Sequence, residues 1–386
     1  MNRHFFKLIW KKRGKNSLLI LEILISFLVL FAIFSMIIYN YGNYFQGLGY
    51  DHTDTWLITL NWRNSDADIT KEKLKHIEQH LLSQKQVEQI SFCKATYPFS
   101  FSTITTEESN VTFDYVGCDE RYFEVLRMPI TEGQAFTLND RMSHLRPVML
   151  SRKAALALFH GENPVGRIFG DDSNLVIKGI VEKYRYSSSF SEDLPVMFRL
   201  FDIRDSTVQG LNNIVVRMKP GTTRAFEAKL MDDLNQIVPG WDVEIQWFSD
   251  LKKTKNSMSI GFIWILVIVA GFLILNVILG LFGLLWYNIN LRKAEIGLRR
   301  ALGASKKLIT QHFIKETLVL TTFAVIVGLL FAIQFPIMGV FSINPVIYLG
   351  AIGCSLLFLY GLIFLCALAP SRQASEVEPA VALYEE

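Results

Sequence analysis

The stretch LRKAEIGLRRALGASKKLITQHF, which runs from Leu291 to Phe313, lies between two long apolar runs of the chain. Glu295 is its only acidic residue. Because membrane proteins keep short loops rich in Lys and Arg on the cytoplasmic side, this stretch predicts a cytoplasmic connector, which we place at residues 288–316. Its basic residues up to Phe313 are Arg292, Lys293, Arg299, Arg300, Lys306 and Lys307.

The connector also carries a helical pattern. Apolar or small residues recur at spacings of three and four, opposite the basic residues, as in an amphipathic helix. Gly303 is expected to divide the segment into two short helices. Two interpretations remain open: a basic loop that only fixes the topology, or a docking surface for a cytoplasmic partner. The predicted apolar face consists of Leu298, Leu302, Ser305, Ile309 and Phe313.

Four apolar runs are each long enough to cross a hydrocarbon core, which takes about 20 helical residues. They cover residues 17–39, 259–287, 317–338 and 345–369, and Glu22 is their only charged residue. A chain of 386 residues that is 51% hydrophobic is too apolar to be wholly soluble. We therefore expect an α-helical membrane domain with four transmembrane helices.

The basic clusters predict the orientation. Residues 1–16 hold six Lys or Arg and no acid, so this N-terminal segment, like the connector and the tail at 370–386, is expected in the cytoplasm. A cleaved signal peptide is the rival interpretation of the first run. That run is longer than the usual apolar core of such a peptide and lacks an evident small-x-small cleavage site, so we expect it to be retained.

Residues 40–258 carry more acidic than basic side chains and predict a large α+β extracytoplasmic domain between the first two spans. Strand, helix and strand patterns follow each other at 56–61, 70–86 and 87–92, and again at 213–218, 222–237 and 243–248. These two βαβ units, at about 55–92 and 212–248, are expected to form one split subdomain. An inserted subdomain at about 94–205 would hold strands at 111–117, 148–150 and 175–182, and a helix at 151–159 that Ser151 caps.

Several of these stretches resemble the MacB/FtsX family of ABC transporter permeases. The external phrases are GCDERYFEVL from Gly117, EGQAF from Glu132, VMLSRKAALALFHGENPVGRIF from Val148 and VIKGIVEKYRY from Val176. The connector motif comprises Glu295, Ile296, Gly297, Ala301, Gly303 and Ala304. The tail contributes Pro370, Ala374, Pro379, Ala380, Ala382 and Leu383.

The resemblance implies a permease subunit in which the connector is a coupling helix that contacts a cytoplasmic ATPase. It implies a second permease chain, an inner-membrane location, and export of an antimicrobial compound, a peptide or a lipoprotein by mechanotransmission. In some systems of this kind the resemblance would extend the set of partners to a periplasmic adaptor and an outer-membrane channel. The alternative is an FtsX-like regulator or sensor that activates a periplasmic partner. The coupling residues would be Glu295, Ile296, Gly297, Arg299, Arg300, Ala301, Gly303 and Ala304.

The sequence contains no G-x-x-x-x-G-K-[ST] loop, whose backbone amides would cradle phosphates. We therefore expect no ATPase activity in this chain, and ATP with its Mg²⁺ in a partner. We expect no catalytic residue and no bound cofactor or metal. His76 and His80 lie one helical turn apart, but no third ligand is near them in sequence, so a solvated helix face is the preferred interpretation over a metal site.

Other polar and small residues leave alternatives open. Cys93 and Cys118 are external and could pair, whereas Cys354 and Cys366 fit small apolar positions in the last span. Glu22 could reach the interface, pair with a basic group, or take part in proton coupling. We expect the remaining residues to serve assembly through hydrogen bonds or close helix packing. They are Asn276, Gln334, Ala324, Gly328 and Ala332.

Overall fold

The computed structural model describes residues 13–62, 67–100, 105–108, 110–170, 174–201, 212–340 and 343–375. The chain divides into two compact units, one of Met1–Gly42 with Ile260–Glu386 and the other of Asn43–Ser259. Most of the basic N-terminal segment, and the tail residues Pro379, Ala380, Ala382 and Leu383, lie outside the described residues.

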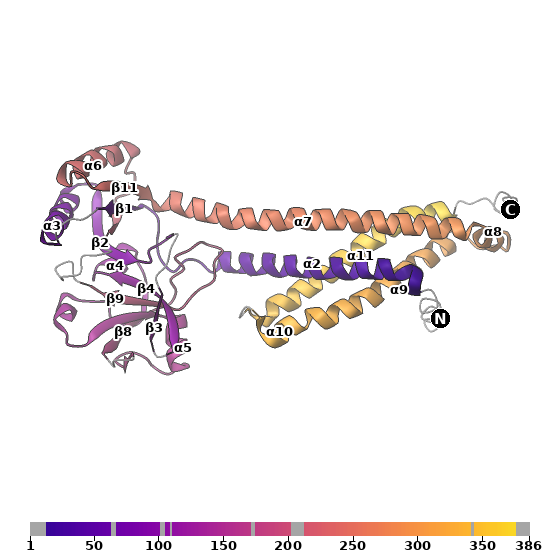
Figure 1. The fold of residues 1–386 in the computed structure, drawn as a ribbon, viewed down its shortest axis with the longest axis horizontal. Coiled ribbons are helices and arrows are strands. Elements are labelled where there is room, and N and C mark those ends of the chain that lie inside the picture. The colour runs from indigo at the N-terminus through magenta and orange to yellow at the C-terminus, as the bar shows by residue number, and fades with distance from the viewer. Residues whose placement is uncertain are drawn as a thin grey trace. The chain divides into compact units, whose positions relative to one another are not determined.

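The first unit is built from long apolar helices (Figure 1). Within the described residues, four helices are long and apolar enough to cross a membrane, as predicted. Helix α9 is followed directly by the short α10, Gln334–Met338. The four long helices are α2 (Arg13–Phe45), α7 (Phe248–Leu291), α9 (Lys306–Ala332) and α11 (Pro345–Ser375).

Helices α2, α9 and α11 share an apolar core in this unit. Phe27 and Ile23 of α2 are fully buried with Ala324 of α9 and Leu359 of α11. Helix α7 takes little part in this core. Only 11% of the most apolar stretch of α7 is buried against the rest of the chain, compared with 28–39% in the other three helices. The second span therefore keeps most of its apolar surface available to lipid or to another protein.

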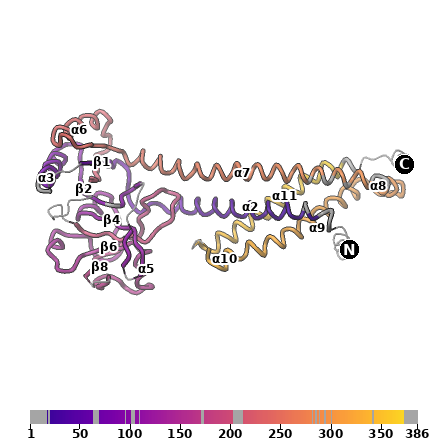
Figure 2. Tube along the Cα trace, viewed as in Figure 1, coloured from indigo at the N-terminus to yellow at the C-terminus, as the bar shows by residue number. Residues whose placement is uncertain are grey.

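The second unit begins with a four-stranded antiparallel arrangement in the order β11-β1-β10-β2. Each neighbour is antiparallel, so β1 runs parallel to β2 and β10 runs parallel to β11, and the two βαβ units interleave as a split motif. Figure 2 follows the chain through this arrangement. The elements are β1 (Thr55–Asn61), α3 (Ala67–Ser83), β2 (Val87–Ala95), β10 (Asn213–Met218), α6 (Arg224–Ile237) and β11 (Asp242–Trp247).

Helices α3 and α6 cover one face of these strands. Leu74, Ile77 and Leu81 of α3 and Leu230 and Leu234 of α6 are fully buried in one core with strand residues. The last predicted strand, 243–248, lies one residue too far along the chain, because β11 covers Asp242–Trp247 and Phe248 is the first residue of α7. The strand therefore passes into the second span without an intervening loop.

The inserted segment extends the same sheet instead of forming a separate one. Strand β2 pairs with β4, and the order continues β4-β9-β6-β8-β5, so that the described strands form one eleven-stranded sheet with β3 and β7 at its sides. The predicted cap of α5 is present, since Ser151 Oγ accepts from Ala154 N at 3.3 Å. The elements are β3 (Thr105–Glu108), β4 (Val111–Cys118), α4 (Tyr122–Val125), β5 (Ile130–Gly133), η1 (Leu138–Met142), β6 (Arg146–Ser151), α5 (Arg152–Phe159), β7 (Ile168–Phe169), β8 (Leu175–Val181) and β9 (Val196–Leu200).

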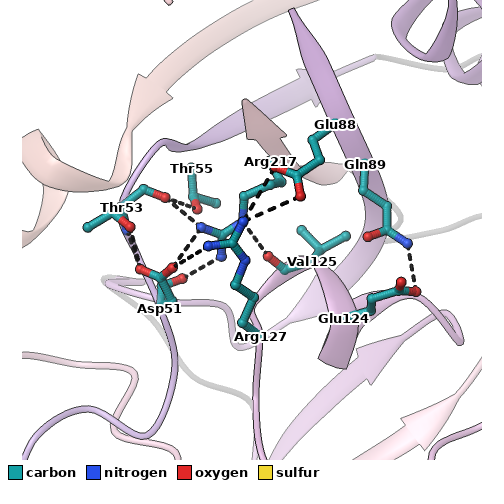
Figure 3. A network of polar contacts seen from close by, with 9 residues as sticks. All are labelled: Asp51, Thr53, Thr55, Glu88, Gln89, Glu124, Val125, Arg127 and Arg217. Carbon is teal, nitrogen blue, oxygen red and sulfur yellow. Dashed lines mark hydrogen bonds and ion pairs between the residues drawn. The ribbon is translucent and has the colours of Figure 1, made fainter. Parts of the chain in front are cut away.

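A buried arginine fixes the segment that leads from α2 into β1 (Figure 3). Arg217, on β10, is 2% exposed and donates from Nε to Val125 O at 2.8 Å. Its Nη1 donates to Asp51 Oδ2 at 3.1 Å and to Thr53 O at 2.7 Å, and its Nη2 donates to Asp51 O at 2.9 Å. Among the described residues, Asp51 O and Thr53 O accept no backbone hydrogen bond from a neighbouring strand, and Arg217 donates to both. In this way the segment avoids leaving buried polar atoms unpaired.

Candidate functional site

The connector folds as two helices with a break at the predicted glycine. Helix α8, Lys293–Ala301, ends before Gly303, and α9 begins at Lys306. Gly303 has φ +94°, a conformation that glycine adopts without strain, and Ser305 Oγ caps α9 by accepting from Leu308 N at 3.3 Å. The second helix is not short, however, because α9 continues into the third span as one 27-residue helix.

The apolar face of the connector differs from the predicted one. Ile296 of α8 is buried with Ile289, Ile309 and Phe313, whereas Leu298 and Leu302 are 52% and 79% exposed. The prediction was wrong for these two leucines because it counted helical spacings across Gly303, where the helix is interrupted. As a result, α8 is held to α7 and α9 by one side, whereas Leu298 on α8 and Leu302 in the turn after it are exposed.

Two ion pairs orient the connector. Arg292 donates to Glu316 through both terminal nitrogens, at 2.9 and 3.1 Å, so the start of α8 is tied to α9. Glu295 accepts from Arg299 Nη2 at 2.5 Å, one turn along the same helix. The second pair is about half exposed and contributes little to stability, typically less than about 1 kcal/mol. The side chain of Arg300 is outside the described set.

A cavity of about 360 Å³ opens between α8 and α9. Its lining includes the basic residues Arg292, Arg299 and Lys315, the acidic Glu295, and the apolar Ile296 and Phe313. Charged and apolar side chains of both helices thus line the same hollow.

The predicted intramembrane residues lie at different places. A Cβ atom added to Gly280 of α7 would come within 2.5 Å of Glu22 Oε2, so this glycine, which sequence reasoning missed, gives the carboxylate its space. A Cβ atom on Gly328 would likewise meet Phe27 Cδ1 at 2.5 Å. Asn276 donates to Phe272 O of its own helix at 2.8 Å, and Gln334 is exposed at the start of α10.

A second polar centre, which was not predicted, lies in the second unit, Asn43–Ser259, which we call the external unit. Arg185, which is 1% exposed, donates from Nη1 to Asn43 O at 2.5 Å and to Gly47 O at 3.0 Å, at the C-terminal end of α2. Its Nε and Nη2 donate to Ser191 O and Ser189 O, at 3.0 and 3.2 Å. The only signal in the sequence was the phrase VEKYRY, in which this arginine lies between two buried tyrosines.

The loop that Arg185 holds also contacts the start of α7. Ser189 N donates to Asn256 Oδ1 at 3.0 Å, and Asn256 Nδ2 donates to Ser189 Oγ at 3.2 Å. Ser259 Oγ adds a bond of 3.2 Å to Ser188 Oγ. We call Arg185, the loop at 188–191 and Asn256 the clamp, because together they join the end of α2 to the beginning of α7 inside the external unit.

The histidines of α3 do not form a metal cluster in the part of the chain that the structure describes. His80 Nε2 lies 3.3 Å from Asp233 Oδ2 and 3.1 Å from Gln84 Nε2. These contacts link α3 to α6 and to its own end, which is a structural role.

Comparison with known proteins bears on both units. A family profile described as MacB-like periplasmic core domain matches residues 18–232, and one described as FtsX-like permease C-terminal matches residues 258–379. An uncharacterized ABC transporter permease of Bacillus subtilis, YvrN, is 27% identical over 295 residues, which are 71% of each chain. The macrolide export ATP-binding/permease protein MacB of Chromobacterium violaceum is 26% identical over 289 residues, which are 72% of this chain and 44% of that protein.

The chain thus spans less than half the length of the MacB relative. Among solved structures, the periplasmic region of MacB from Actinobacillus actinomycetemcomitans aligns with 53% of this chain and 94% of that one, at 19% identity and a TM-score of 0.38. The matches and the four apolar helices fit a protein of the inner membrane. Because the first profile alone covers more than half of the 386 residues, the chain belongs to the family of MacB/FtsX-like ABC transporter permeases.

Proposed function

We propose that this chain is the permease subunit of an ABC transporter, and that a separate cytoplasmic ATPase docks on the connector and drives export by mechanotransmission. The observation that carries the proposal is that buried Ile296 anchors α8, while Leu298 of α8 and Leu302 of the following turn are exposed. Exposed apolar side chains on a charged segment are what a protein-docking surface presents.

Movement of the ATPase would reach the membrane helices through the contacts that hold α8 to α9. Because Arg292 binds Glu316 and Ile296 packs against Ile309 and Phe313, a force applied to α8 is passed to α9, which continues into the third span. The partner would supply ATP and Mg²⁺, since this sequence holds no phosphate-binding loop. The sparsely buried α7 supports a second permease chain as the neighbour of the second span.

The external domain would respond to movement of α2 and α7, which the clamp joins at their external ends. Four spans with few polar residues offer poor lining for an aqueous channel, so a substrate would be taken up outside the cytoplasm. The cargo would be an antimicrobial compound, a peptide or a lipoprotein. A periplasmic adaptor and an outer-membrane channel would be needed only if the cargo crosses a second membrane.

The test replaces an exposed leucine of the connector. Leu302→Asp should abolish copurification of an ATPase that carries a phosphate-binding loop, because a carboxylate would be desolvated at the interface. Leu156→Asp, at a 51% exposed leucine of α5, is the matched control and should retain the ATPase. Both variants should be present in the membrane at wild-type levels.

Normal ATPase binding by Leu302→Asp would refute docking through this surface. The alternative function, an FtsX-like regulator of a periplasmic partner, would be supported by a different result. In that case the wild-type protein would copurify with a cell-wall hydrolase and with no such ATPase, under conditions that preserve known ABC complexes.

A further inference from the structure

Two cysteines of the external domain face each other across neighbouring strands. Cys93 of β2 is the direct partner of Cys118 of β4 in an antiparallel ladder. Asp119 N donates to Phe92 O at 3.2 Å, which joins the residues on either side of the pair. That bond identifies a non-hydrogen-bonded pair, in which the Cα atoms lie about 4.5 Å apart and the side chains project together.

This separation lies within the range of about 4.4–6.8 Å between Cα atoms that a disulfide requires. Both thiols are fully buried in the same core and are free in the structure. The other two cysteines cannot pair with each other in this way. Cys354 and Cys366 lie twelve positions apart on α11, roughly 18 Å along the helix axis.

The position of the pair gives a disulfide a mechanical role. Only three residue pairs join β2 to β4 among the described residues, and the cysteines are the first of them. This short ladder is where the split βαβ strands meet the inserted strands. We propose that Cys93 and Cys118 are oxidised to a cross-strand disulfide in the mature protein, and that this bond staples the two parts of the external sheet.

The chemistry requires oxidation before the core closes. Burial raises the pKa of both thiols, and the carboxylate of Asp119 raises them further, so the folded dithiol holds little of the thiolate that reacts. In the unfolded chain, one cysteine thiolate attacks the disulfide of an oxidant protein or small molecule and forms a mixed disulfide. The thiolate of the second cysteine then attacks the first cysteine's sulfur in that mixed disulfide and displaces the oxidant's second thiolate. Two protons and two electrons leave the cysteines, and the oxidant departs as its dithiol.

Once formed, the bond is protected by the same burial. A reductant would have to reach sulfur atoms that have no exposed surface in the folded domain. The inference rests on the external placement of the domain in the proposed function, because the cytoplasm would keep the thiols reduced.

The experiment counts thiols in the full-length protein from membranes of aerobically grown cells. Samples are precipitated with acid, dissolved in detergent and labelled with maleimide-polyethylene glycol, with and without prior reduction. We expect two labels before reduction, on Cys354 and Cys366, and four afterwards. Cys93→Ser should give three labels in both cases, because it releases Cys118, whereas the control Cys354→Ser should give one label before reduction and three after.

Loss of the bond should also lower the melting temperature of the external domain by roughly 10 °C, in Cys93→Ser and Cys118→Ser alike. Four labels before reduction would overturn the disulfide. A disulfide-linked dimer of the wild type that is absent in Cys93→Ser would also overturn the proposal, because Cys93 would then be bonded to a second chain and not to Cys118. Labelling of Met142→Cys from outside the cell, at a side chain that is 90% exposed, then shows separately whether the external placement holds.

Discussion

Arg185 and Arg217 are both buried, and both donate mainly to backbone carbonyl oxygens rather than to carboxylates. Each therefore ties carbonyl groups at a helix end, Asn43 O of α2 or Val125 O of α4, to carbonyl groups of a neighbouring loop. A guanidinium group suits this task because it offers five donors in a rigid plane and keeps its charge when buried. At the scale of single residues, the geometry of the external domain near α2 depends on these two side chains.

Arg185→Met should destabilise the external domain by about 3 kcal/mol or more, because Asn43 O and Gly47 O would lose charged donors in a buried site. Thermal unfolding of the purified protein, together with hydrogen exchange at residues 188–191, would measure the loss. The control Arg152→Met removes surface ion pairs to Glu132 and Glu182 and should cost less than about 1 kcal/mol. Equal losses in the two variants would rule out the clamp as a stabilising centre.

His52 should make the domain less stable in mild acid. Its Nε2 lies 3.1 Å from Lys252 Nζ, and burial together with this cation lowers the pKa of His52. The unfolded histidine binds a proton below about pH 6.5 while the folded one does not, so stability falls as the pH drops through 6.5 toward the folded pKa.

The measurement is the urea midpoint at pH 7.5 and 5.5 for the wild type and His52→Gln. Asp119 acts in the opposite sense, because burial raises its pKa to about 6 and the folded carboxyl gains its proton first as the pH falls. Since Asp119 is present in both proteins, the difference between the two curves isolates His52. Identical pH dependence in wild type and variant would show that His52 is not the responsible group.

At the scale of elements, local sequence patterns predicted most of the helices and strands, whereas the pairing of elements that are distant in sequence was the least predictable. The four spans could be found because a bilayer crossing needs a long uncharged run, and the split βαβ strands because helix and strand periods alternate there. The boundary at Phe248 could not be placed, since the residue is apolar and fits both a strand end and a span. The exposed Leu298 was mispredicted because Gly303, at φ +94°, ends the helical phase on which the spacing argument depended.

Contacts between distant elements needed the structure. Neither Glu22 beside Gly280 nor Arg185 beside Asn43 follows from any spacing in the sequence, because each pair brings together residues more than 100 positions apart. The direct pairing of Cys93 with Cys118, which are much closer in sequence, likewise depends on the register of β2 on β4. The residues of such sites can be suspected from their type, but their partners depend on the register of packed elements.

Gly328 should be required for the packing of α9 on α2. A larger residue would overlap Phe27, so Gly328→Leu should destabilise the membrane unit by about 1–3 kcal/mol. The matched control is Gly353→Leu on α11, where an added Cβ meets nothing within 4 Å. The fraction of protein that stays monodisperse in detergent after heating would compare them, and equal resistance of both variants would contradict the packing argument.

For the whole molecule, a net charge of only +3 conceals a separation of charge along the chain. Basic residues gather in residues 1–16 and in the connector, whereas the external segment carries more acids than bases. The bias of short loops toward the cytoplasm acts on Lys and Arg rather than on net charge. Orientation therefore depends on how Lys and Arg are distributed along the chain, and both the proposed ATPase docking and the proposed disulfide depend on it.

The orientation should be directly measurable with single cysteines. Met142→Cys in the external unit and Leu302→Cys in the connector are 90% and 79% exposed, so both can react once a reagent reaches their side of the membrane. In intact spheroplasts, a membrane-impermeant maleimide should label Met142→Cys at once and Leu302→Cys only after permeabilisation. Denatured samples of each variant give the total reactive thiol for normalisation. Immediate labelling of Leu302→Cys would place the connector outside, where no ATPase could bind it.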